Sequence, residues 1–63
     1  MPIIEVNMFE GRTAEQKQTL IAAMTGVVTD TLGVPAENVR IIIRELSKDD
    51  FGIGGKTARA QGR

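Results

Sequence analysis

The sequence predicts an α/β fold: a single domain over residues 1–63 that forms a βαβ unit with parallel strands and a C-terminal loop or hairpin arm, completed by oligomerisation. Apolar residues alternate near the N-terminus, and a β-branched run covers 39–46, as is typical of strands. Between these segments the apolar spacing changes to three and four residues, which is the spacing of a helix. A strand, a long helix and another strand, in that order, favour a parallel pair joined by a crossover.

The first strand is expected over residues 3–9, IIEVNMF. Side chains of a strand alternate between its two sides, so Ile4, Val6 and Met8 share one side. The other side carries the remaining residues of the segment, among them Phe9. The EGRT segment that follows contains a glycine and ends the strand.

The helix is expected to run from about Ala14 to about Leu32. Thr13, followed three residues later by Gln16, matches the capping-box pattern of a helix N-terminus. Gly33 is well placed to end the helix as its C-terminal cap, and a proline two positions later prevents continuation. One apolar stripe follows the helix, made of Leu20, Ile21, Met24, Val27, Val28 and Leu32.

The second strand, VRIIIREL, has apolar residues on both of its sides. A single helix covers only one face of a two-stranded sheet, so the other face requires another copy of the chain. Chain length points the same way, because a domain of this size buries only about 60% of the surface that its unfolded chain exposes. We therefore expect a homo-oligomer.

Composition excludes several classes of function. Cysteine and histidine are absent, which removes disulfides and the usual zinc ligands. Eight basic and eight acidic residues give zero net charge, unlike the basic surface of a nucleic-acid-binding protein. No apolar run approaches the roughly 20 residues of a membrane span, and there is no signal-peptide pattern. We therefore predict a cytoplasmic protein with neither nucleic-acid nor membrane partners.

Few side chains are suited to catalysis. Ser47 is the one serine, and without a histidine it cannot form a hydrolase triad. The segment GIGGKT matches neither a phosphate-binding loop nor a dinucleotide fingerprint. Removal of Met1 would, however, make the ring nitrogen of Pro2 a free secondary amine.

The arginines are the other candidates. Arg12 precedes the positive end of the helix dipole, an unfavourable place for a cation that hints at an external anion. Arg40 and Arg44 share the strand side that another subunit is expected to cover, where a guanidinium suits a carboxylate partner. The alternative for each arginine is an ordinary surface ion pair, and a surface or intersubunit ion pair is the preferred interpretation of Arg44.

Four features in register along nearly the whole chain carry a family resemblance: the proline behind Met1, the run FEGRT followed by EQK, the segment VRIIIRE and the late FGIGGK. Together they resemble the 4-oxalocrotonate tautomerase family of amino-terminal proline enzymes. The resemblance implies the tautomerase/MIF-like fold and a homohexamer built as a trimer of dimers. It also implies isomerisation of 2-hydroxy-dienoate acids such as 2-hydroxymuconate to their 2-oxo forms, without a metal or an organic cofactor.

The resemblance also implies roles for individual residues. Pro2 would be the general base that moves the proton, Arg12 would bind the far carboxylate of the substrate, and Arg40 would bind the near carboxylate and the 2-oxo or enol oxygen. Phe51 would be the aromatic wall of the site, and the main chain around Phe9 would be its other boundary. Proline and arginines of one site would come from different subunits.

These roles agree with elementary electrostatics. Two guanidinium groups and an apolar wall of Phe51 and Ile53 would disfavour the protonated amine and lower the pKa of Pro2 toward neutrality. The same cations would stabilise the dienolate as its charge develops.

Two rival functions stay open. A haloacrylate dehalogenase or hydratase of the same superfamily would add an acidic residue near the proline to activate water. Ile53 lies in the region where such an acid is expected, and nothing places Asp49 or Asp50 in the site. A catalytically silent oligomerisation module would keep the fold and lack enol–keto activity.

Overall fold

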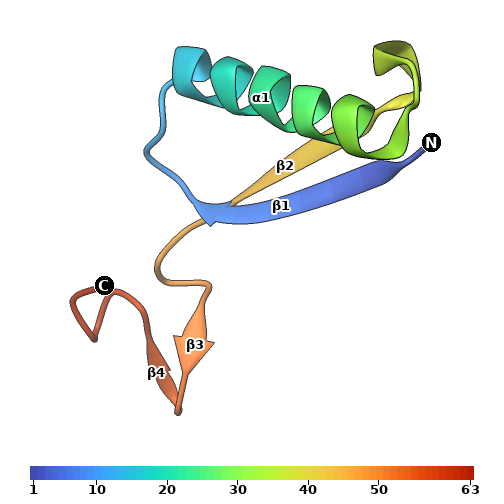
Figure 1. Ribbon diagram of the computed structural model, residues 1–63. Helices are drawn as coiled ribbons and strands as arrows, with labels where there is room; N and C mark the ends of the chain where they lie inside the picture. Colours follow the sequence, from blue (N-terminus) through green and yellow to red (C-terminus); the bar gives the residue numbers. More distant parts are fainter.

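The computed structural model describes all residues, 1–63, and has the predicted order of elements (Figure 1). The elements are β1 (Ile3–Phe9), α1 (Ala14–Leu32), the short 3-10 helix η1 (Ala36–Asn38), β2 (Arg40–Leu46), β3 (Gly52–Ile53) and β4 (Lys56–Thr57). β2 begins one residue later than the β-branched run predicts. The reason is local, since the N–H of Val39 closes η1 by donating to the carbonyl of Ala36 at 3.1 Å.

Both predicted caps of α1 are confirmed. The hydroxyl of Thr13 accepts from the N–H of Gln16, and the Gln16 side chain accepts from the N–H of Thr13, both at 3.0 Å. At the other end Gly33 is in the left-handed region (φ 68°), and its N–H donates to the carbonyl of Thr29 at 2.9 Å. Only glycine adopts this conformation without strain. Neither α1 nor η1 combines the length and apolar content that a membrane span requires.

We expect Thr13→Ala to lower the free energy of unfolding by about 1 kcal/mol, because the first turn of α1 loses its side-chain acceptor. Urea unfolding at a fixed protomer concentration measures the change. Thr19→Ala is the matched control, since Thr19 is exposed within the same helix and its hydroxyl has no hydrogen-bond partner. Equal unfolding midpoints for Thr13→Ala and the wild type would show that the capping box does not stabilise the protein.

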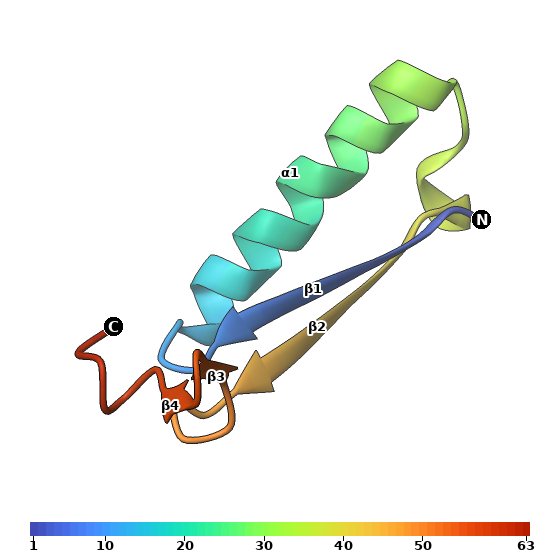
Figure 2. The same ribbon diagram turned by 90° about the horizontal axis from the view of Figure 1, so that it is seen from below.

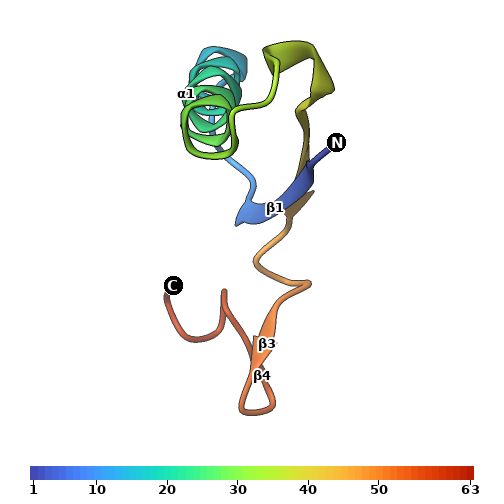
Figure 3. The ribbon, with the colours of Figure 1, turned by 45° about the vertical axis from the view of Figure 1, so that its right-hand side comes forward.

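β1 and β2 form a parallel pair, as predicted, and in its register Ile3 faces Arg40 and Phe9 faces Leu46. Figure 3 shows α1 lying across one side of this sheet. Half-buried apolar residues of both strands point to that side, namely Ile4, Val6, Met8, Ile41 and Ile43. The ion pair between Lys17 and Glu45 (2.9 Å) also ties the start of α1 to the end of β2.

The sheet face away from α1 has no covering element of its own. It carries Ile3 and Ile42, which are 53% and 41% exposed. Burial of such residues against a partner is favourable by about 25 cal/mol per Å² of apolar surface. This face is therefore the surface that the sequence predicts to be covered by another copy.

The C-terminal segment forms the expected hairpin arm, and β3 pairs with β4 in antiparallel fashion. Gly54 and Gly55 connect the strands with φ values of 61° and 87°, as a type I′ turn requires. Gln61 braces the hairpin, because its side-chain amide donates to the carbonyls of Ile53 (2.9 Å) and Lys56 (3.1 Å). The arm begins where the two long strands end, opposite the N-terminal end of the sheet (Figure 2).

The chain makes almost no core by itself. Ala58 is the one fully buried residue of the 63. The radius of gyration is 14.8 Å, whereas a compact chain of this length has a value of about 11 Å. A hydrophobic face without cover and an extended arm both indicate a protomer whose stability depends on association.

Candidate active site

Pro2 and Arg40 lie together where β1 and β2 begin. The N–H of Arg40 donates to the carbonyl of Pro2 at 3.0 Å. Pro2 is half-buried and Arg40 is exposed, and the guanidinium of Arg40 donates to the backbone carbonyl of Glu37. The structure thus brings two of the predicted site residues to one end of the sheet.

The ring nitrogen of Pro2 is acylated by Met1 in the full sequence, and a tertiary amide has no basic lone pair. Met1 is 71% exposed, so the group to be removed lies at the surface of the protomer. Its removal converts the amide nitrogen into a secondary amine, and α-amino groups have pKa values of about 7.7–8.0 in peptides. A base close to neutrality is therefore within reach of this position once Met1 is gone.

Phe9, Phe51 and Ile53 gather at the opposite end, between the sheet and the arm. The two rings meet edge to face, with centroids 5.4 Å apart and planes at 85°. They line a largely apolar cavity of about 430 Å³, which we call the aromatic cavity; its walls are Asn7, Met8, Phe9, Leu46, Phe51, Ile53 and Arg63. No aspartate or glutamate lines it.

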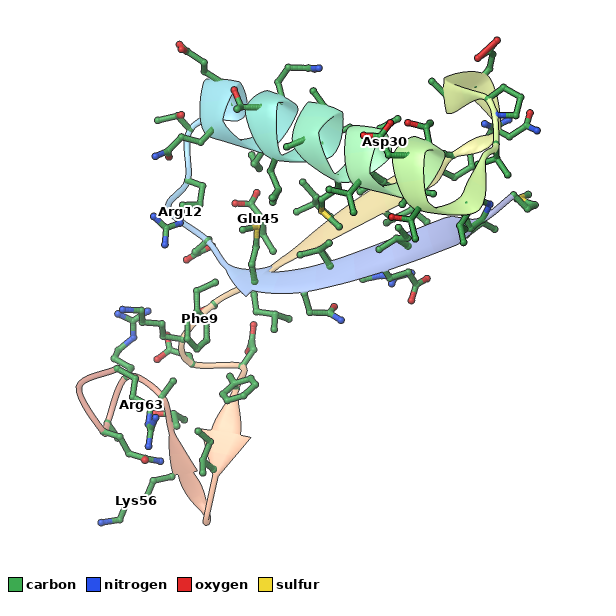
Figure 4. The ribbon with its side chains drawn as sticks, viewed as in Figure 1. Phe9, Arg12, Asp30, Glu45, Lys56 and Arg63 are labelled. Carbon is green, nitrogen blue, oxygen red and sulfur yellow. The ribbon has the colours of Figure 1, made fainter.

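Arg12 lines an adjoining cavity of about 290 Å³, which we call the Arg12 cavity. Its walls are Met8, Phe9, Glu10, Gly11, Arg12 and Lys48, so Met8 and Phe9 border both cavities. Figure 4 shows Arg12 and Phe9 at the end of β1, on the side from which the arm descends. The guanidinium of Arg12 is exposed and makes neither an ion pair nor a hydrogen bond within the chain. It is therefore free to bind an anion.

The two halves of the predicted site are far apart in one protomer. Six strand steps separate Ile3 from Phe9, which corresponds to about 20 Å at 3.3 Å per residue. A six-carbon acid cannot contact Pro2 and Arg12 of the same chain across that distance. The predicted site, in which Pro2 and Arg12 contact the same substrate, would therefore combine the Pro2 end of one copy with the Arg12 end of another.

Arg44 is engaged within the chain. Its guanidinium pairs with Glu5 at 2.9 Å on the uncovered sheet face, in accordance with the preferred interpretation of an ion pair. The hydrogen bond from Arg44, and then its charge, lower the pKa of Glu5, and the same contact raises the pKa of Arg44. Arg44 is thus already neutralised and is unlike Arg12.

The carboxylate of Asp49 is also occupied. Arg59 donates to it at 2.6 Å, and this hydrogen bond, followed by the carboxylate charge, raises the pKa of Arg59. Asp50 is exposed and lines neither cavity. Neither aspartate stands where it would activate water beside the aromatic cavity, and no group of three or more carboxylates gathers anywhere in the chain.

Lys48 and Arg63 are cavity residues that the sequence analysis missed. Lys48 belongs to no motif. Its place two residues after the second predicted strand was a usable signal, because in a parallel pair the ends of both strands lie at the same edge of the sheet. Arg63 enters the aromatic cavity only because the C-terminal turn folds back; its N–H donates to the carbonyl of Ala58 at 3.0 Å. No local sequence pattern predicts that return.

Comparison with known proteins shows which family the chain belongs to. The family model described as "Tautomerase enzyme" matches residues 2–61. A 2-hydroxymuconate tautomerase from Stutzerimonas stutzeri is 46% identical over 63 residues, which is the whole of both chains. A structure of the 4-oxalocrotonate tautomerase isozymes from Methylibium petroleiphilum superposes with a TM-score of 0.90 at 46% identity, covering 97% of this chain and 95% of the other.

A fused 4-oxalocrotonate tautomerase, described as an asymmetric trimer, is also similar. It aligns with a TM-score of 0.89 at 41% identity. The match covers 100% of this chain and 51% of the fused one. The chain belongs to the tautomerase family of enzymes, and its βαβ fold is that of the 4-oxalocrotonate tautomerases.

Proposed function

We propose that this tautomerase converts 2-hydroxy-dienoate acids, such as 2-hydroxymuconate, to their 2-oxo enoate isomers. The observation that carries the proposal is the 46% identity with a 2-hydroxymuconate tautomerase along the full length of both chains. The geometry agrees with it, since an apolar cavity beside an unpaired arginine suits a flat, unsaturated acid.

Pro2 is the proposed base, after removal of Met1. Its amine takes the proton of the substrate's 2-hydroxyl group, and the electron pair moves through the conjugated system. The protonated amine then returns the proton to another carbon of the substrate's conjugated system. One O–H bond breaks and one C–H bond forms, so no co-reactant is needed. The nitrogen is restored at the end of each cycle.

The arginines supply binding and charge stabilisation in this proposal. Arg12 binds the remote carboxylate, and Arg40 binds the near carboxylate and the 2-oxo oxygen, on which negative charge develops. Phe51, Ile53 and the main chain at Phe9 enclose the diene and exclude water. Burial beside cations disfavours the protonated amine and lowers the pKa of Pro2.

We also propose a homohexamer built as a trimer of dimers. This chain spans about half the length of the fused relative that is described as a trimer. Three fused chains therefore correspond in length to six copies of this chain. The uncovered sheet face and the split site both support a closed assembly in which every copy is equivalent. Light scattering should give the mass of six chains.

The test follows the change in ultraviolet absorbance of 2-hydroxymuconate after the enzyme is added. We expect the dienol to convert to its 2-oxo isomer at a rate proportional to enzyme concentration, while 3-chloroacrylate releases no chloride under the same conditions. Chloride release without ketonisation would favour the dehalogenase alternative. Normal assembly with neither reaction would favour the silent module.

A further inference from the structure

The Arg12 cavity contains a second cation that the proposed mechanism does not use. Lys48 lines the cavity together with Arg12, and Glu10 is the one acidic residue among its walls. Two positive charges and one negative charge leave a net charge of +1. An anion that enters this cavity therefore neutralises it.

Lys48 has no acidic partner of its own. The three ion pairs of the chain are Lys17–Glu45, Arg44–Glu5 and Arg59–Asp49. The ammonium of Lys48 instead lies 5.8 Å from the centre of the Phe9 ring, which is a weak cation–π contact. Because Phe9 borders both cavities, the ammonium lies next to a side chain that the Arg12 cavity shares with the aromatic cavity.

The backbone around Lys48 is held by hydrogen bonds. The N–H of Arg59 donates to the carbonyl of Lys48 at 3.2 Å. In the same turn, the N–H of Asp50 donates to the carbonyl of Ser47 at 2.9 Å, and the N–H of Asp49 donates to the Ser47 hydroxyl at 3.1 Å. The half-buried Lys48 is therefore presented from a defined turn, as a binding residue requires.

We propose that Lys48 is a specificity-determining residue that binds the remote carboxylate of the substrate together with Arg12, so that the enzyme selects dicarboxylic over monocarboxylic enols. A monoacid leaves both cations unpaired as the substrate closes the cavity, whereas a diacid pairs them. The inference rests on the proposed function, since it assigns the substrate class of the same site.

The test compares kcat/KM for 2-hydroxymuconate with that for 2-hydroxy-2,4-pentadienoate, which lacks the remote carboxylate. We expect Lys48→Met to lower the value for the diacid by about tenfold. The value for the monoacid should stay within about twofold of the wild type. Lys48→Arg should keep the preference for the diacid, because the charge is retained.

Lys56→Met is the matched control, since it removes an exposed lysine at the hairpin, away from both cavities (Figure 4). It should leave both kcat/KM values unchanged. Equal losses for the two substrates in Lys48→Met, or no loss for either, would overturn the proposal.

A binding measurement separates this proposal from the proposed function. Muconate and sorbate are six-carbon dienes with two carboxylates and one, and neither bears the reacting hydroxyl. By calorimetry, Lys48→Met should weaken muconate binding about tenfold and leave sorbate binding unchanged. If the wild type turns over neither enol acid, the proposed function fails, and these titrations still decide the role of Lys48. Equal muconate affinity in wild type and Lys48→Met, or no muconate binding by the wild type, would refute it.

Discussion

Replacement of Pro2 by alanine should lower kcat for ketonisation of 2-hydroxymuconate by about 10²-fold, the lower end of the usual range for a general base. Alanine also permits removal of Met1, so the variant ends in a primary amine. That amine rotates freely and is not held toward the substrate by a ring. The carbonyl at position 2, which accepts from the N–H of Arg40, is unchanged, so the assembly should persist.

Pro35→Ala is the control for this variant. Pro35 caps η1 with φ of −67° and makes no side-chain hydrogen bond. Its replacement should leave kcat unchanged. Wild-type turnover by a fully processed Pro2→Ala protein with an unchanged oligomeric state would show that catalysis does not depend on the proline ring amine and that another group is the base.

Mixing two inactive variants should restore activity if the site is shared between copies. Arg12→Met alone should lower kcat/KM by about 10–100-fold, because a charge-assisted contact is lost. After Pro2→Ala and Arg12→Met chains are unfolded and refolded together in equal amounts, about a quarter of the sites combine an intact Pro2 with an intact Arg12. The mixture should therefore regain about a quarter of the wild-type rate.

The control mixture pairs Pro2→Ala with the double variant that carries Pro2→Ala and Arg12→Met. Every site in this mixture lacks Pro2, so no rate should return. A site formed within one protomer makes a different prediction: the first mixture would then show only the mean rate of its two parents. That outcome would contradict the separation of about 20 Å between the two ends of β1.

The elements of the fold could be predicted because each has a local cause. The change of apolar spacing defined β1 and α1, and the capping pair Thr13 and Gln16 together with Gly33 defined the helix ends. The need for a partner also followed from local pattern, since β2 has apolar residues on both sides. The start of β2 was placed one residue early because the β-branched Val39 closes a 3-10 turn.

The partners in the charged contacts could not be predicted, because they are residues far apart in the sequence. Lys17 reaches Glu45 across 28 positions. Arg44 reaches Glu5 only because the parallel register sets the strands side by side. Lys48 lines the same cavity as Arg12 only because the parallel pairing places the ends of β1 and β2 at the same edge of the sheet, and no motif marks it.

The intact mass and the activity of one purified sample test the central claim most directly. The account predicts a mass that lacks Met1, together with ketonisation of 2-hydroxymuconate by that same sample. Turnover by a sample shown to retain Met1 completely would contradict it, because the nitrogen of Pro2 would then be an amide and could not act as the base.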